Sequence, residues 1–251
     1  MTITSQSNEI VNEQQLRIDL AAALRLAAYY DWHEGVANHF SAAVSADGRK
    51  FLINPRWKHF SLATASGLVL VDADDPQTMD RPDAPDPSAW SIHSAIHKMV
   101  PHARVALHLH PPYATTLATM KDPSIKPLDQ VTARFFNRLA IDMSFGGIAT
   151  EEAEGERIAA TIGNHSAVMM ANHGVTTIAP TVAEAFDALY HLERAAKTMV
   201  LAYSTGQELN PMDDGIAEEV AQEWEVYKDA EFSHFTEMKK VLDRDNPGYA
   251  E

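Results

Sequence analysis

Helical and strand-like patterns alternate along this chain, and the alternation restricts its possible folds more than any other feature. Leu16, Leu20 and Leu24 recur at helical spacing and predict a helix over about 13–30. Strand-like segments follow, with the sequences FSAAVS, KFLI and LVLVD. Elements of both kinds are typical of layered α/β domains, so we expect helices packed on a sheet.

The rest of the chain continues the alternation. We expect, in order, a surface loop over 72–87, a helix from an N-cap at Ser88 to Met99, a strand over 104–110, a short helix over 113–120, a helix near 151–162, and strands over 167–171 and 175–178. Thr181 and Glu184 predict a capping box that opens a long helix. A final helix is expected over about 215–243.

Composition narrows the classes of partner. The formal net charge of -15 repels phosphate backbones and anionic lipid, so we expect a small-molecule partner and neither nucleic acid nor membrane. The chain has no cysteine, which excludes disulfides and thiolate metal sites. Any side-chain metal ligands are therefore histidines or carboxylates.

The start of the chain carries no targeting or membrane signal. Residues 1–12 are polar and lack a basic region followed by an apolar one, so we expect a flexible N-terminus. No apolar run approaches the roughly 20 residues that cross a bilayer. Because composition shows no break, we expect one domain over 13–251 in a cytoplasmic protein.

Three histidines form the strongest candidate site. His108 and His110 alternate along a predicted strand, so both project from one face with backbones about 7 Å apart. His173 follows another predicted strand, in a turn that Gly174 permits. Three neutral imidazoles leave one coordination position open, as in catalytic zinc sites, and manganese or iron would also accept them. The alternative is a polar sheet face without a metal.

The segments VALHLHPPYATTLATM and VMMANHGVTTIAPTVAEAF resemble the class II aldolase/adducin family, and the resemblance spans about residues 14–205. In that family the matching motifs supply three metal ligands, which the resemblance assigns to His108, His110 and His173. It also implies a single three-layer α/β/α domain with a mostly antiparallel sheet, and homotetramers with active sites at subunit interfaces. The implied chemistry is carbon–carbon bond cleavage through a metal-stabilised enediolate.

Two positions depart from the sugar-phosphate aldolases of that family. Ala89 stands where they carry an acid/base glutamate, and Trp57 replaces a small residue of their phosphate-binding turn. Asn38 is retained and would donate a hydrogen bond to an enediolate oxygen. We therefore expect retro-aldol cleavage of a small, non-phosphorylated hydroxy-carbonyl compound. The alternatives are a metal-dependent decarboxylase of a hydroxy or aromatic acid, and a non-catalytic adducin-like binding module.

Further residues are candidates for the missing proton transfer and for substrate binding. His93 and His97 lie one helical turn apart, and His93 would either replace the acid/base or support the ligands, whereas His97 would support them. Tyr113 is a possible proton donor or a packed helix start. Arg134 would bind a substrate carboxylate or form an ordinary ion pair. The other histidines, His39 included, have no predicted role beyond packing or the surface, and Glu193 with Arg194 is expected to form an exposed or interface pair.

Overall fold

The computed structural model describes residues 12–147, 152–227 and 229–251. These residues form a seven-stranded sheet with the strand order β3-β2-β1-β4-β7-β6-β5. Its strands are β1 (His39–Ala43), β2 (Lys50–Ile53), β3 (Val69–Asp72), β4 (Val105–Leu109), β5 (Leu139–Asp142), β6 (Ala167–Met170) and β7 (Gly174–Ala179). All neighbouring strands are antiparallel except β5 and β6, which are parallel. The mostly antiparallel sheet is confirmed, whereas the predicted flexible segment 1–12 lies outside the described residues except for Asn12.

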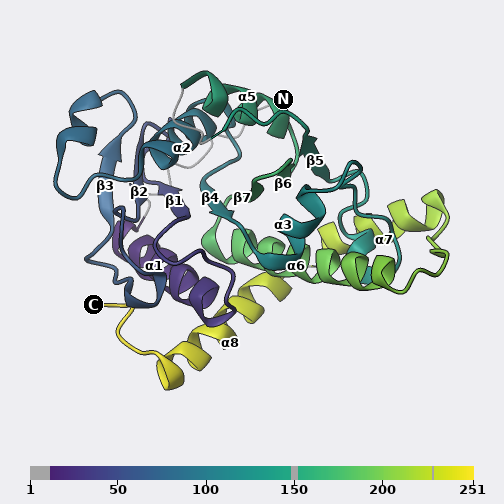
Figure 1. Cartoon of the computed structure of the whole chain (residues 1–251). Helices are drawn as coiled ribbons and strands as arrows, with labels where there is room; N and C mark the ends of the chain where they lie inside the picture. Colours follow the sequence, from purple (N-terminus) through teal and green to yellow (C-terminus); the bar gives the residue numbers. More distant parts are fainter. Residues whose placement is uncertain (1–11, 148–151, 228) are drawn as a thin grey trace, which may run out of the picture.

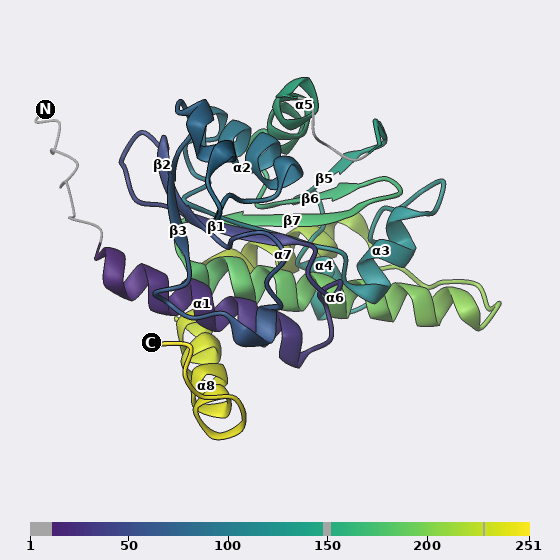
Figure 2. The same cartoon turned by 60° about the vertical axis from the view of Figure 1, so that its left-hand side comes forward.

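Helices cover both faces of the sheet and confirm the three-layer α/β/α prediction (Figures 1 and 2). One face carries α2 (Pro87–Met99) and α5 (Glu152–Ile162). The other face carries α1 (Glu13–Tyr29), α3 (Pro112–Ala118), α4 (Gln130–Ala133) and α6 (Val182–Ser204). Outside them lie α7 (Asp214–Val226), against α4, and α8 (Ala230–Asp245), against α6 and α1. Two short 3-10 helices, η1 (Phe60–Leu62) and η2 (Pro76–Asp80), complete the described elements.

Side chains of strand β4 pack into two apolar clusters, one on each face of the sheet. Leu107 and Leu109 join the core that faces α1 and α6, whereas Ala106 joins the core that faces α2 and α5. Successive side chains of a strand point to opposite faces, so His108 lies on the same face as Ala106. His108 therefore faces the layer that contains α2 and α5.

Several element boundaries differ from the predictions. Helix α2 begins at Pro87, and Asp86 rather than Ser88 is its N-cap, because proline suits the first helical position. The predicted final helix is two helices, and Asp229 between them has φ +66°, which interrupts a right-handed helix. Strand β5 was not predicted, and the loop over 72–87 contains the short helix η2.

The N-terminus of α6 follows its prediction in part. Thr181 is the N-cap, and its hydroxyl accepts from the Glu184 amide at 3.3 Å. The Glu184 carboxylate accepts from the Thr181 hydroxyl at 2.7 Å, so the two side chains bond to each other.

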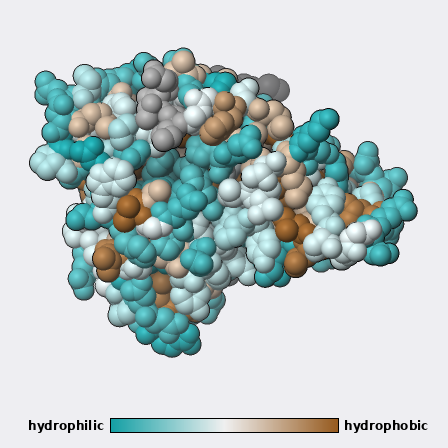
Figure 3. Space-filling view, in the orientation of Figure 1, coloured by the Kyte–Doolittle hydropathy of each residue, from teal (hydrophilic) through white to brown (hydrophobic). Residues whose placement is uncertain are grey.

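The molecular surface agrees with the composition. The face seen in Figure 3 is largely hydrophilic, with apolar residues scattered over it. Among the described residues, no helix is both long enough and apolar enough to span a membrane.

Candidate metal centre and active-site pocket

The fold brings His108, His110 and His173 together. His108 belongs to β4, His110 follows its end, and His173 lies in the turn between β6 and β7. The ring centroids of His108 and His110 are 5.0 Å apart, and that of His173 is 4.8 Å from each. One ring nitrogen from each residue lies within 4.8 Å of the other two, in an arrangement that could hold a metal ion.

Gly174 permits this approach of the two segments. A Cβ atom at this position would lie 2.4 Å from the Leu109 carbonyl oxygen and 2.5 Å from Cδ2 of His110. Asn172, at the start of the turn, has φ +55°. Any side chain at Gly174 would therefore push the His173 turn away from β4.

Hydrogen bonds behind the rings turn two Nε2 atoms toward the centre of the cluster. Nδ1 of His108 lies 3.1 Å from the Val175 carbonyl oxygen, so Nδ1 is the donor and Nε2 is left with its lone pair. Nδ1 of His110 lies 2.6 Å from a carboxylate oxygen of Glu34. The two Nε2 atoms are 3.1 Å apart, close to the roughly 3.3 Å that tetrahedral Zn–N geometry gives. The donor set thus fits a divalent ion.

Burial keeps two of the three imidazoles, those of His108 and His173, uncharged. Desolvation, followed by the neighbouring imidazoles, lowers the pKa of His108 well below its usual value. Desolvation and the nearby His110 lower the pKa of His173 to about 4. Because a metal binds the neutral imidazole, both side chains are ready for an ion at neutral pH.

The three histidines line a cavity of about 510 Å³, a volume that suits a small molecule. Polar and charged side chains also line it, namely Glu34, Asn38, His39, Asn54, Arg56, Asp86, Ser88, Thr115 and Asn172. Trp57, with φ +62° and 64% exposed, and Phe145, which is also exposed, are its large apolar residues. Two of the predicted site residues, Asn38 and Trp57, thus line the same cavity as the three histidines.

Asn38 is a buried donor without an acceptor. The residue is 7% exposed and has φ +74°, and its Oδ1 accepts from the Glu34 amide at 2.9 Å. Its Nδ2, like Oγ1 of Thr115, is buried without a partner among the described residues. A buried donor of this kind costs free energy until an oxygen approaches it, so the pocket suits an oxygen-bearing ligand.

His39 is a site residue that sequence reasoning missed. It lies directly opposite His108 in the pairing of β1 with β4, and the two rings stack with centroids 4.7 Å apart. Its Nδ1 lies 2.7 Å from Nε2 of His93, and its Nε2 lies 3.4 Å from the Ser88 hydroxyl. Only strand register could have placed His39 here, because it is distant from His108 in sequence.

The predicted His93 stands behind His39 and not in the pocket. It is fully buried, and Nδ1 of His93 and Nε2 of His97 both hydrogen-bond to the Ser41 hydroxyl. Nδ1 of His97 donates to the Ala103 carbonyl at 2.9 Å. These hydrogen bonds connect the pocket to the interior of the α2 layer.

Ala89 is absent from the pocket lining. Its side chain is fully buried in an apolar cluster with Phe51, Ile53 and Val69. The carboxylates that line the cavity are instead Glu34, on the loop after α1, and Asp86, the N-cap of α2. Both come from segments that gave no catalytic signal in the sequence.

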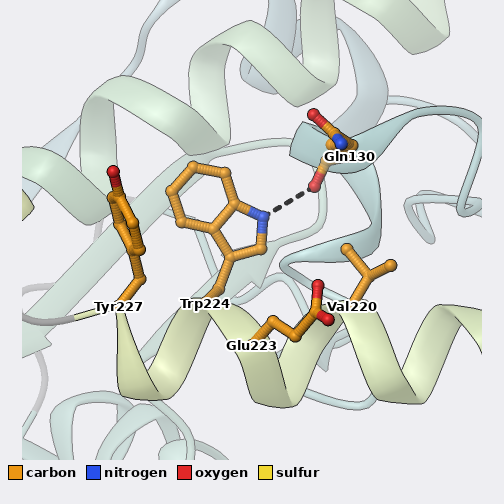
Figure 4. A pocket seen from close by; sticks show the side chains of 5 residues that line it. All are labelled: Gln130, Val220, Glu223, Trp224 and Tyr227. Carbon is orange, nitrogen blue, oxygen red and sulfur yellow. Dashed lines mark hydrogen bonds between the residues drawn. The ribbon is translucent and has the colours of Figure 1, made fainter.

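Arg134 lies in a different part of the molecule. Its guanidinium pairs with Asp187 at 2.7 Å and stacks over Trp224, 4.9 Å from the ring centroid. Trp224, whose indole donates to the Gln130 carbonyl, lines a separate pocket of about 260 Å³ with Tyr227 and its neighbours (Figure 4). The structure thus gives Arg134 the ion-pair role that was the alternative to substrate binding.

Tyr113 also lies outside the pocket lining. Its amide donates to Glu193 at 2.9 Å, and Lys197 lies over its ring. Glu193 is 5% exposed, so its assignment to an exposed or interface pair with Arg194 is wrong. The carboxylate turns inward because it accepts hydrogen bonds from the first amides of α3.

Comparison with known proteins identifies relatives over most of the chain. The family model described as class II aldolase and adducin N-terminal domain matches residues 18–200. The "Putative aldolase class 2 protein" of Caulobacter vibrioides is 34% identical over 95% of this chain and 93% of its own length. The decarboxylase NovR of Streptomyces niveus is 27% identical over 76% of this chain and 71% of its own. A crystal structure of an aldolase II superfamily protein from Pseudomonas syringae superposes with a TM-score of 0.86 at 30% identity, covering 96% of this chain and 97% of that one.

Proposed function

Because the chain belongs to the class II aldolase and adducin family, we propose that it is a divalent-metal-dependent carbon–carbon lyase. The reaction is retro-aldol cleavage of a small, non-phosphorylated hydroxy-carbonyl compound. The observation that carries this proposal is the convergence of three imidazoles on one cavity, two of them held by hydrogen bonds at Nδ1. A binding module without chemistry has no need of such a cluster.

In retro-aldol cleavage, a hydroxyl loses its proton and becomes a carbonyl, while the electron pair of the broken carbon–carbon bond passes to the other fragment as an enediolate. That fragment then takes up a proton at carbon, so the reaction neither consumes nor releases a net proton. A divalent ion, with zinc as the first choice, would polarise the substrate carbonyl and stabilise the negative charge that the cleavage creates. Nδ2 of Asn38 would donate to a substrate oxygen, since it has no other acceptor among the described residues.

In this proposal His93 is a positioning residue, which orients His39. It is sealed from the cavity, so it does not touch the substrate. Its hydrogen bond to Nδ1 of His39 fixes the orientation of the one additional imidazole that lines the pocket. The His93→Ala variant would therefore loosen His39 without removing any group that contacts the substrate.

Metal analysis with matched variants tests the proposal. We expect one zinc per chain in the native protein and in His102→Ala, an exposed histidine outside the cluster, and loss of that zinc in His108→Ala. The metal-loaded native protein should release an aldehyde from hydroxy-carbonyl substrates. Absence of bound metal, with His108→Ala unchanged in stability, would instead leave the adducin-like binding module.

Decarboxylation of a hydroxy or aromatic acid is the second candidate. The 27% identity to a protein named as a decarboxylase favours it, and so does Ala89, which cannot transfer the proton that aldol chemistry requires. Carbon dioxide released in place of an aldehyde, in a screen of both substrate classes, would select this reaction.

We also propose a cytoplasmic homo-oligomer, with a tetramer as the first expectation. The exposed Trp57 and Phe145 at the cavity support an interface beside the pocket. Tyr113 and Arg134 do not line their own chain's pocket, so catalytic or substrate-binding roles for them require a neighbouring subunit. Light scattering of the purified protein measures the oligomeric state.

A further inference from the structure

Arg56 is the one arginine or lysine among the described residues that line the metal-centre cavity. It lies on the turn after β2 and is half-buried. Its side chain forms no hydrogen bond, ion pair or ring contact within the described parts of the chain. The other arginines there each have an acceptor or an aromatic ring for a partner.

Hydrogen bonds connect the turn that carries Arg56 to neighbouring segments, including the one that lines the cavity at Asn38 and His39. The Arg56 amide donates to the Ala84 carbonyl at 3.2 Å. Asn54 accepts from the Phe40 amide at 2.8 Å and donates to the Asn38 carbonyl at 3.3 Å. These bonds connect the turn to the segment that presents Asn38 and His39, so Arg56 is placed by the same framework as the rest of the site.

The two carboxylates of the cavity already have partners of their own. Glu34 accepts from Nδ1 of His110, and Asp86 accepts from the Ser88 amide and hydroxyl at the start of α2. No ion pair joins either of them to Arg56 in the described residues. The guanidinium therefore remains the cavity's available partner for an anion.

We propose that Arg56 binds a substrate carboxylate, and that the substrate is a hydroxy-carbonyl acid whose carboxylate is remote from the oxygens at the histidine cluster. This inference rests on the proposed lyase function and names its substrate class. A planar guanidinium binds a carboxylate through two parallel hydrogen bonds. Asn38 and Thr115 are the two cavity-lining residues with a buried, unpartnered polar atom among the described residues, and they would meet the substrate's remaining oxygens.

Charge favours a carboxylate over a phosphate. A phosphate monoester carries more negative charge than a carboxylate at neutral pH and would meet one arginine together with Glu34 and Asp86. One guanidinium neutralises one carboxylate.

Three hydroxamates that differ at one end test the proposal on the zinc-loaded protein by titration calorimetry. Succinic monohydroxamate ends in a carboxylate, butyrohydroxamate ends in a methyl group, and 3-phosphonopropanohydroxamate ends in a phosphonate. Their shared hydroxamate chelates zinc. The variants are Arg56→Met and, as a matched loss of one positive charge outside the cavity lining, Lys58→Met.

We expect the native protein to bind the carboxylate probe about tenfold or more tightly than the methyl probe, the range of a charged hydrogen bond. That advantage should vanish in Arg56→Met and persist in Lys58→Met. Equal affinity of all three proteins for butyrohydroxamate would show that the variants are folded and loaded.

Two results would overturn the inference. A carboxylate advantage that is absent from the native protein, or that survives in Arg56→Met, removes Arg56 as the anchor. An Arg56-dependent preference for the phosphonate over the carboxylate overturns the proposed substrate class. Failure of the zinc-loaded native protein to bind any hydroxamate would count against the open metal site, and so against the proposed function itself.

Discussion

At the scale of single residues, Glu193 stabilises the chain segment that follows His110. Its two carboxylate oxygens accept from the amides of Tyr113 at 2.9 Å and Ala114 at 2.8 Å. These are among the amides at the start of α3 that have no partner within the helix. Pro111 and Pro112 lie between this cap and His110, so Glu193 on α6 fixes the chain directly after a proposed metal ligand.

The Glu193→Gln variant should lower the free energy of unfolding by about 1 to 3 kcal/mol, because one buried amide then faces an NH₂ group. Burial raises the pKa of Glu193 to about 7, against the effect of the two amide donors, so the comparison belongs at pH 8. Urea unfolding measures the change. The exposed Glu219→Gln is the control, and an equal effect of both variants would contradict the capping role.

At the scale of elements, Asp187 on α6 joins three helices through one buried carboxylate. It accepts from Nδ1 of His234 on α8 at 2.7 Å, lies 3.3 Å from Nδ1 of His191, and pairs with Arg134, just after α4. Burial by itself would raise the pKa of Asp187, but the hydrogen bonds from the two histidines and the charge of Arg134 lower it below its usual range. The carboxylate is therefore ionised at neutral pH and attracts all three partners.

We expect Asp187→Asn to lower the free energy of unfolding by about 2 to 4 kcal/mol. This is slightly less than the usual cost of breaking a buried ion pair, because the Arg134 side chain is partly exposed to solvent. Hydrogen exchange should accelerate first in α8, since the substitution removes the carboxylate that binds His234. Asp245→Asn, at the end of α8, is the control. Uniform exchange along the chain would argue against a local role in docking α8.

At the scale of the whole molecule, the α2 layer encloses imidazoles that folding keeps uncharged. Desolvation is the largest cause for each. It lowers the pKa of His97 to about 4 and of His39 to about 3, and that of His93 well below its ordinary value. In the unfolded chain these groups take up protons near pH 6.5. The unfolded state therefore binds more protons than the folded state between pH 6.5 and 4.

Stability of the metal-free protein should consequently fall as pH falls from 6.5 toward 4, by up to about 1.4 kcal/mol per pH unit for each such group. The raised pKa of Glu193 acts in the opposite direction over part of this range, as one group against several. Unfolding measured across this range in the native protein and His97→Gln should give a shallower slope for the variant. An unchanged slope in His97→Gln, with the exposed His102→Gln as reference, would contradict this account.

Local patterns in the sequence were sufficient for most elements and for placing His108 beside His110, whereas the resemblance to the family assigned the three histidines to one metal site. Helical spacing predicted α1, and strand alternation placed His108 and His110 on one face, because these patterns depend on neighbours a few residues apart. Strand β5, with the sequence LAID, escaped prediction because Ala140 and Asp142 are of residue types that are depleted in strands. The break before α8 escaped it because the helical pattern of α7 continues in α8.

Tertiary structure alone decided what surrounds those histidines. Glu34, His39 and Arg56 reach the cavity, whereas His93 and Arg134 do not, although all five are polar residues in plausible positions. Pairing of β1 with β4 sets His39 against His108, and packing of α2 on the sheet seals His93 inside. The sequence by itself determined the fold class and the three imidazoles. Their neighbours depend on register and packing between segments far apart in the chain, which no local periodicity encodes.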